Sequence, residues 1–175
     1  MLRILLSVSA AALAGACLLP AQSASSAAEV KQAYNNVKRN ITAAADKVSD
    51  ADYNFKATPD VRTFGQLIGH VADSQLRGCS ALNGEMKQPS AGSKTEKADL
   101  VAALKDSFAE CDKAFDALTD ANANEAVSAG RGQRTRLGAL YGQVVHDNEM
   151  YGYMSVYMRL KGVVPPSSEP RGRGR

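Results

Sequence analysis

The sequence contains no tryptophan, two histidines, three cysteines and ten aromatic residues in a chain of 175. Two histidines and three cysteines are too few for a pair of zinc fingers or for a disulfide-dense scaffold. The net charge of +3 is too small to indicate a nucleic-acid partner, and we expect none. Hydrophobic residues make up 45% and charged residues 22%, which is ordinary for one soluble globular domain. Any chemistry that needs imidazole must therefore use His70 and His146.

The first 28 residues have the features of a secretory signal peptide. Arg3 supplies the positive charge, residues 4–19 form an apolar run, and Pro20 ends it. Small residues then offer three cleavage positions, after Ser23, Ala27 or Ala28. The run is rich in Ala, Ser and Gly and is short for a membrane-spanning helix. We therefore expect cleavage, an exported (periplasmic or secreted) protein, and no stable membrane insertion afterwards.

Four amphipathic segments account for most of the remaining chain. Their apolar residues recur every three or four positions, the period of a helix with one buried face. These segments are residues 28–48, 63–83, 94–118 and 135–161. No segment shows the strict alternation of a half-buried strand. The predicted fold class is all-α, a four-helix bundle over residues 29–166 with a disordered Arg/Gly tail over residues 167–175.

The ends of these segments carry recognisable signals. The capping-box pattern, in which a hydroxyl residue is followed three positions later by Glu or Gln, occurs twice. Its two examples are Thr63 with Gln66 and Ser93 with Glu96. Gly162 follows the fourth segment as a stop signal.

The cysteines leave two states open. Cys17 lies in the predicted leader, and Leu13 stands one place too early for a lipoprotein site, so we expect no lipidation. Cys79 and Cys111 both lie on apolar helix faces and either stay buried as free thiols or form a disulfide in an oxidising compartment. In a flush helical hairpin they would be ~15 Å apart along the axis, whereas a disulfide needs Cα atoms within about 7 Å. Pairing therefore requires staggered helices, which the long loop over residues 84–92 would permit.

His70 lies near the middle of the second predicted helix, with Asp73 one turn away. At His146 the apolar stripe of the fourth helix breaks into the polar run 146–149, HDNE. Buried polar groups without partners cost about 1–3 kcal/mol each. Either a metal or a small polar pocket supplies these partners, or Asp147 and Asn148 face water and His146 forms a hydrogen bond inside the bundle.

The segments around both histidines resemble the DinB-like (DinB/YfiT-type) family. Residues 61–73, VRTFGQLIGHVAD, look like the second helix of that family. Residues 146–152, HDNEMYG, and residues 157–166, YMRLKGVVPP, look like its last helix and the exit from it. The resemblance covers about residues 28–168. It implies a four-helix bundle that binds a divalent metal through three His, two of them in an H-x-x-x-H on the last helix. Some members are thiol-dependent transferases or isomerases.

In this pattern His70 and His146 match two metal ligands, and Met150 stands where the third His is expected. A thioether is a poor ligand for zinc, nickel or manganese. Met150 therefore fills a degenerate site, or Asp73 or Glu149 supplies a carboxylate and leaves an open position for water. In a third alternative, both histidines and Met150 bind copper(I). The cofactor is accordingly one divalent metal (zinc, nickel, manganese or iron), copper, or none.

Two functions follow. In the first, an exported bundle with a degenerate metal site binds an unidentified small molecule or has a structural role. In the second, the protein is a metal-dependent hydrolase or a thiol or group transferase that uses His70, His146 and a carboxylate. Whether the protein is an enzyme depends on the third ligand. The apolar stripe of the first helix serves either the core or a homodimer.

Overall fold

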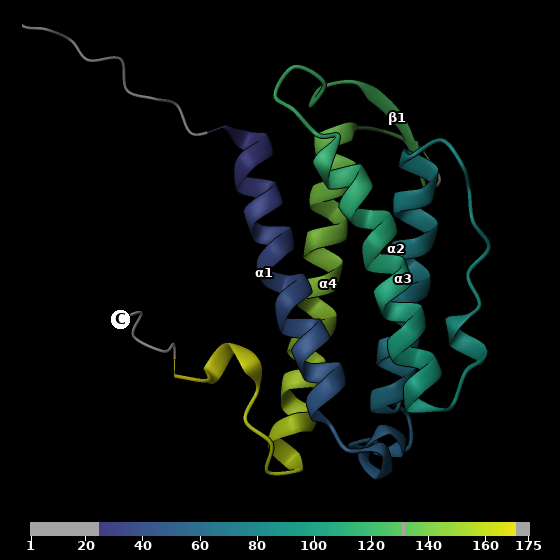
Figure 1. Ribbon diagram of the computed structural model, residues 1–175, viewed down its shortest axis with the longest axis vertical. Coiled ribbons are helices and arrows are strands. Elements are labelled where there is room, and N and C mark those ends of the chain that lie inside the picture. Colours follow the sequence, from purple (N-terminus) through teal and green to yellow (C-terminus); the bar gives the residue numbers. More distant parts are fainter. Residues whose placement is uncertain (1–24, 131, 171–175) are drawn as a thin grey trace, which may run out of the picture.

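The computed structural model describes residues 25–130 and 132–170. Most of the predicted leader and the Arg-rich end of the tail lie outside these described residues. Figure 1 shows four long helices packed side by side, which confirms the predicted all-α bundle. The helices are α1 (Ser26–Lys47), α2 (Phe64–Leu82), α3 (Lys97–Asp116) and α4 (Arg136–Leu160).

Of the two predicted capping boxes, the one at Thr63 is present at the start of α2. The Gln66 N–H donates to Thr63 Oγ1 at 3.1 Å, and the Thr63 N–H donates to Gln66 Oε1 at 2.9 Å. The Ser93 box is wrong, because Ser93 belongs to a separate short 3-10 turn, Ala91–Ser93, and α3 begins only after Glu96. That turn is held against α2 instead of opening a helix. Gly162 ends α4 with a φ of 70°, as expected of a glycine stop.

A small β-hairpin joins α3 to α4 and was not expected from the sequence. Strand β1 (Ala126–Ala129) pairs antiparallel with β2 (Gly132–Thr135), and Gly130 takes a φ of 62° in the turn. Glycine accepts this left-handed conformation at little cost. All four residues of β2 are exposed, so its sequence carries no alternation of apolar and polar residues that would signal a strand.

Helices α2 and α3 are parallel, so they do not form a hairpin. Near the start of both, a Cβ at Gly65 would lie 3.2 Å from Leu100 Cδ1, and near their ends the Cα atoms of Cys79 and Cys111 are 4.9 Å apart. The connection over residues 83–96 therefore returns along the whole bundle, as Figure 1 shows beside α2. The flush hairpin assumed above was wrong, because this long crossover makes the helices parallel instead of merely staggered.

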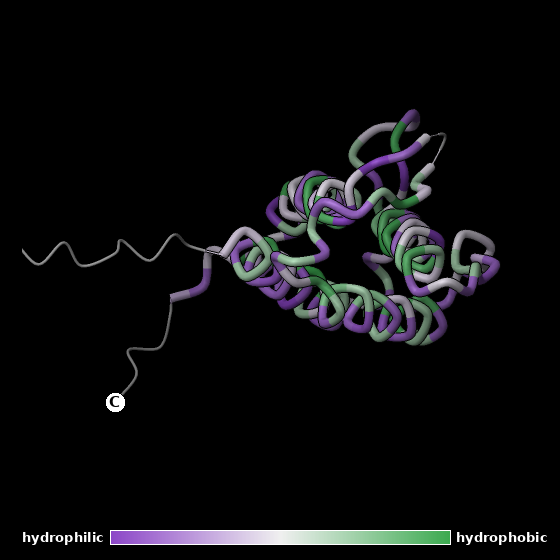
Figure 2. The backbone as a smooth tube through the Cα atoms, turned by 90° about the horizontal axis from the view of Figure 1, so that it is seen from above, coloured by the Kyte–Doolittle hydropathy of each residue, from purple (hydrophilic) through white to green (hydrophobic). Residues whose placement is uncertain are grey.

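The core lies between the four helices, which surround it when the bundle is viewed along their axes (Figure 2). The apolar stripe of α1 is buried there, and it comprises Tyr34, Val37, Ile41 and Ala44. The Tyr34 ring stacks on Phe115 with ring centroids 3.8 Å apart. This stripe is thus used by the core and is not available as a homodimer surface.

The predicted disorder of the tail is wrong for its first residues. Pro166–Ser168 form a 3-10 turn. The Ser167 N–H donates to the Tyr151 hydroxyl at 2.9 Å, and Glu169 pairs with Lys47 of α1. These contacts fold the segment back onto the bundle. Residues 171–175 lie outside the described part. Among the described residues, no helix has the length and apolarity needed to cross a membrane.

Glu110 of α3 forms hydrogen bonds with two residues of the crossover, Asn83 and Lys87. Its buried carboxylate accepts from Asn83 Nδ2 at 2.6 Å, Lys87 Nζ at 2.7 Å and Lys113 Nζ at 3.1 Å. The Lys87 bond first, and the Asn83 bond next, lower the pKa of Glu110 from its ordinary value of 4.5 to about 2. The ionised carboxylate is therefore favoured by folding.

We expect Glu110→Gln to lower the free energy of unfolding at pH 7 by about 1 kcal/mol. Because the folded pKa is depressed, the carboxylate contributes fully above pH 4.5, and the contribution falls as pH drops from 4.5 towards 2. Urea unfolding at pH 7, 4.5 and 3 measures this, and the deficit of the variant should shrink at pH 3. Glu125→Gln, which removes an exposed pair with Arg136, is the control and should change little. A deficit that is independent of pH would contradict the account.

Candidate functional site

The two histidines meet in the middle of the bundle. His70 of α2 and His146 of α4 approach with their Nε2 atoms 3.1 Å apart and their ring centroids 5.1 Å apart. At this distance one Nε2 carries a hydrogen and donates it to the other. Burial, followed by the positive charge of Arg62, lowers the pKa of His70, which favours a neutral imidazole. Sequence motifs 76 residues apart are thus brought into contact.

Asp147 orients His146 from the other side of the ring. Its Oδ1 lies 3.3 Å from His146 Nδ1 and accepts from Gln143 Nε2 at 3.1 Å. Asp147 is fully buried, and desolvation raises the pKa of its carboxyl against the opposing effect of His146. The alternative in which Asp147 faces water is wrong, whereas Asn148 is exposed. The sequence did indicate that Asp147 is buried, because it lies three residues after Val144 and therefore on the apolar stripe of α4.

Gln75 completes a buried polar cluster that the sequence reasoning did not assign to the site. Its side chain is fully buried, and neither its Nε2 nor its Oε1 has a hydrogen-bond partner among the described residues. Asp147 Oδ2 is likewise without a partner there. The Gln75 amide lies close enough to Asp147 to offset part of the rise in its pKa that burial causes. It does not reach hydrogen-bond geometry with that carboxylate. Gln75 interrupts the apolar stripe of α2, and this interruption could have indicated a buried polar cluster.

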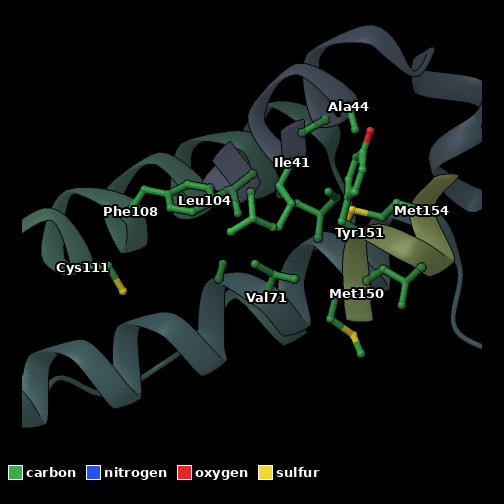
Figure 3. Packing of buried hydrophobic residues seen from close by; sticks show 14 of the residues in the cluster. Ile41, Ala44, Val71, Leu104, Phe108, Cys111, Met150, Tyr151 and Met154 are labelled. Atoms are coloured by element: carbon green, nitrogen blue, oxygen red, sulfur yellow. The ribbon is translucent and has the colours of Figure 1, made fainter. Parts of the chain in front are cut away.

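Of the residues predicted to replace a third His ligand, both carboxylates are engaged elsewhere and Met150 is buried in the core. Met150 is 5% exposed and belongs to the buried apolar cluster that also contains Val71 and Met154 (Figure 3). The Asp73 carboxylate accepts instead from the backbone N–H groups of residues 91 and 92 at 2.7 and 2.8 Å. Glu149 is exposed and accepts from the Tyr153 hydroxyl at 3.3 Å.

The donor set therefore fits a metal only in part. Two Nε2 atoms 3.1 Å apart can both lie about 2.0–2.1 Å from one ion. In residues 25–130 and 132–170, however, no group of three His, Cys, Asp or Glu side chains is placed to hold one. Asp147 approaches the opposite nitrogen of His146 and is an orienting group for that imidazole, not a third ligand.

A cavity of about 530 Å³ opens beside His146. Its walls are α2 from Ser74 to Leu82, α4 from Ala139 to His146, and the β-hairpin with Arg134. Cys79, which forms a disulfide with Cys111 in the structure, belongs to the α2 wall. His146 thus borders a space large enough for a small molecule.

This arrangement of helices and histidines agrees with a known family. The model of the DinB superfamily matches residues 33–154. The chain belongs to the DinB superfamily. The family model spans α2 and most of α4, so both histidines lie within the matched part of the DinB chain. No curated protein matches the sequence.

Solved structures show the same fold in other DinB-like proteins. A DinB-like protein from Bacillus cereus has a TM-score of 0.68 at 16% identity, over 78% of this chain and 93% of that one. A DinB-like protein from Bacillus subtilis has a TM-score of 0.63 at 19% identity, over 84% and 99%. A conserved protein from Enterococcus faecalis has a TM-score of 0.61 at 16% identity, over 76% and 95%. At these identities the likeness establishes the DinB fold alone.

Proposed function

We propose that this protein is a small-molecule-binding DinB bundle whose histidine metal site is degenerate. The observation that supports the proposal is the pairing of His70 with His146, while Met150, four residues further along α4, is buried in the apolar core. Met150 offers a thioether to zinc, nickel, manganese or iron, which these ions bind poorly. The cavity beside His146 supplies the space for a ligand, and the His146 imidazole supplies a hydrogen-bonding group at its edge.

One observation favours the alternative, a metal-dependent hydrolase or a thiol or group transferase. The carboxylate of Asp147 contacts His146 Nδ1 and leaves Nε2 directed at His70, which is how carboxylates orient metal-binding histidines. A divalent ion bound there would acidify a water or polarise a carbonyl. We rank this alternative second, because Asp73 and Glu149 are both engaged elsewhere.

A zinc titration followed by nuclear magnetic resonance of the imidazoles separates these functions. The chain has only two histidines, so His70→Ala assigns both signals. In the wild type we expect no saturation at one equivalent of zinc with micromolar protein. Saturation of both imidazoles at one equivalent would overturn the degenerate site and support the alternative. A joint shift of both imidazoles and the Met150 methyl with copper(I) would instead establish the copper site.

We also propose that the protein is exported and that the leader is cleaved after Ser23. Ser25 caps α1, Ala27 is buried, and the Ala27 N–H donates to Asp120 Oδ1 at 3.0 Å. Of the three small-residue positions, only cleavage after Ser23 keeps this cap and this contact. Sequencing of the N-terminus of the exported protein tests this, and a start later than Ser25 would contradict it.

A further inference from the structure

The cavity beside His146 has positive charge on its walls and no negative charge. Arg77 of α2 and Arg134 of β2 line it, and none of its lining residues is Asp or Glu. Some other basic side chains of the bundle pair with carboxylates, as Lys38 does with Asp112. Among the described residues, neither Arg77 nor Arg134 forms such a pair. The cavity is therefore lined by two arginines that form no ion pair with a carboxylate of the described residues.

Two glycines keep polar groups close to the helix backbones on either side of this cavity. A Cβ at Gly142 of α4 would lie 2.9 Å from the Arg134 guanidinium nitrogen Nη1. A Cβ at Gly78 of α2 would lie 3.0 Å from Gln143 Oε1. The absence of side chains at these positions lets Arg134 reach across from the hairpin to α4. The Arg134 guanidinium thus lies against α4 at the edge of the cavity, although the residue itself is exposed.

The rest of the wall is largely apolar. Alanine, leucine and methionine side chains from the two helices, the crossover and the hairpin contribute to it, namely Ala81, Leu82, Met86, Ala129 and Ala139. A volume of about 530 Å³ lies within the usual range of about 300–1,000 Å³ for small-molecule sites. Such a site is typically apolar with a few polar groups that fix the orientation of the ligand.

We propose that this cavity binds a small oxyanion with an apolar body, its charged group between Arg77 and Arg134. A guanidinium presents a planar fork of N–H donors that matches a carboxylate or a phosphate. The apolar body then lies against the apolar part of the wall, which includes Leu82 and Met86. This assignment rests on the proposed small-molecule-binding function and adds the chemical class of the ligand.

The test compares four probes that separate charge from apolar body. They are 3-phenylpropionate, 3-phenylpropyl phosphate, the neutral 3-phenylpropanol, and inorganic phosphate. Calorimetry measures affinity, and the His146 imidazole signal reports occupancy of the cavity. We expect at least one of the two phenyl oxyanions to bind about tenfold or more tightly than the alcohol, since hydrogen bonds to a charged group exceed neutral ones. The ranking of the two oxyanions identifies a carboxylate or a phosphate as the preferred group.

Three charge-neutralising variants locate the site. Arg77→Gln and Arg134→Gln should each weaken binding of the oxyanion about tenfold and leave binding of the alcohol unchanged. The matched control is Arg136→Gln, because Arg136 pairs with Glu125 and does not line the cavity. It removes the same charge close by and should leave oxyanion binding unchanged. Circular dichroism confirms that each variant keeps its helices.

Four outcomes would overturn the proposal. These are equal affinity for alcohol and oxyanions, an equal loss in the control variant, absence of binding by both phenyl oxyanions, and inorganic phosphate binding as tightly as the phenyl compounds. The proposed function is decided separately by the zinc titration of the protein without probes. Equal affinity for the alcohol would reject the ligand class while leaving a small-molecule site, and zinc saturation would reject the degenerate site whatever the probes do.

Discussion

Reduction of the disulfide between Cys79 and Cys111 is expected to lower the midpoint of thermal unfolding by about 10 °C. The bond links α2 to α3 across a sequence separation of 32 residues. Closing a loop of that length removes unfolded-state entropy equivalent to about 3–4 kcal/mol, and each kcal/mol shifts the midpoint by about 2–4 °C in a domain of this size. The expected effect is large because, apart from the disulfide, the long crossover is the only direct covalent connection between these two parallel helices.

Scanning calorimetry with and without a thiol reductant measures this effect. The matched control is the double variant Cys79→Ala with Cys111→Ala, which should melt near the reduced wild type and should not respond to reductant. A shift below about 2 °C in the wild type would mean that the cross-link contributes little to stability. A response of the double variant would show that the reductant acts elsewhere.

Replacement of Met150 by His is expected to raise the affinity for zinc by about 100-fold or more. The variant restores H-x-x-x-H, and residues four apart on α4 share one face, so the new imidazole joins His146 and His70. Mutation of a group that only orients a metal ligand typically changes metal affinity 10–100-fold. Adding a third direct ligand should change the zinc affinity by more than that. Competition with a chromophoric chelator measures the affinity.

Two variants show whether the gain comes from this site. Met150→Leu keeps an apolar side chain of similar volume without a ligand atom and should bind zinc as weakly as the wild type. Met150→His combined with His70→Ala should lose most of the gain. If the single His variant unfolds because a polar group replaces a buried thioether, circular dichroism detects it, and zinc should then restore the helices. A folded variant with unchanged zinc affinity would contradict the placement of Met150 at the third position.

The helices were predictable from the sequence because each buries one face and so repeats its apolar residues at the helical period. The Thr63 cap was predictable because both partners are adjacent along the chain. The direction of α3 could not be predicted from the sequence. It depends on the crossover, whose turn at residues 91–93 is held by hydrogen bonds to Asp73, 18 and 19 residues earlier in the chain. The hairpin was missed because β2 is exposed and short, so burial leaves no pattern in it.

The site was predicted unevenly for similar reasons. His70 and His146 were selected because imidazoles are rare in this chain and because their flanking motifs resemble a known family. For Asp147 the sequence left two alternatives, a partner in the bundle or exposure to water, because carboxylates are usually solvated, whereas its position on the stripe of α4 places it in the core. Arg77 and Arg134 line one cavity whose wall includes the hairpin, so this cavity depends on an element that the sequence pattern does not reveal.

The most direct measurement for the proposed degenerate site is the metal content of the wild-type protein, determined by native mass spectrometry. The protein is first incubated with zinc, nickel, manganese, iron or copper(I) and then passed through a desalting column. The account predicts that none of these ions is retained stoichiometrically by the wild type, whereas Met150→His retains about one zinc per chain. Retention of about one ion per wild-type chain, lost in His70→Ala, would contradict it.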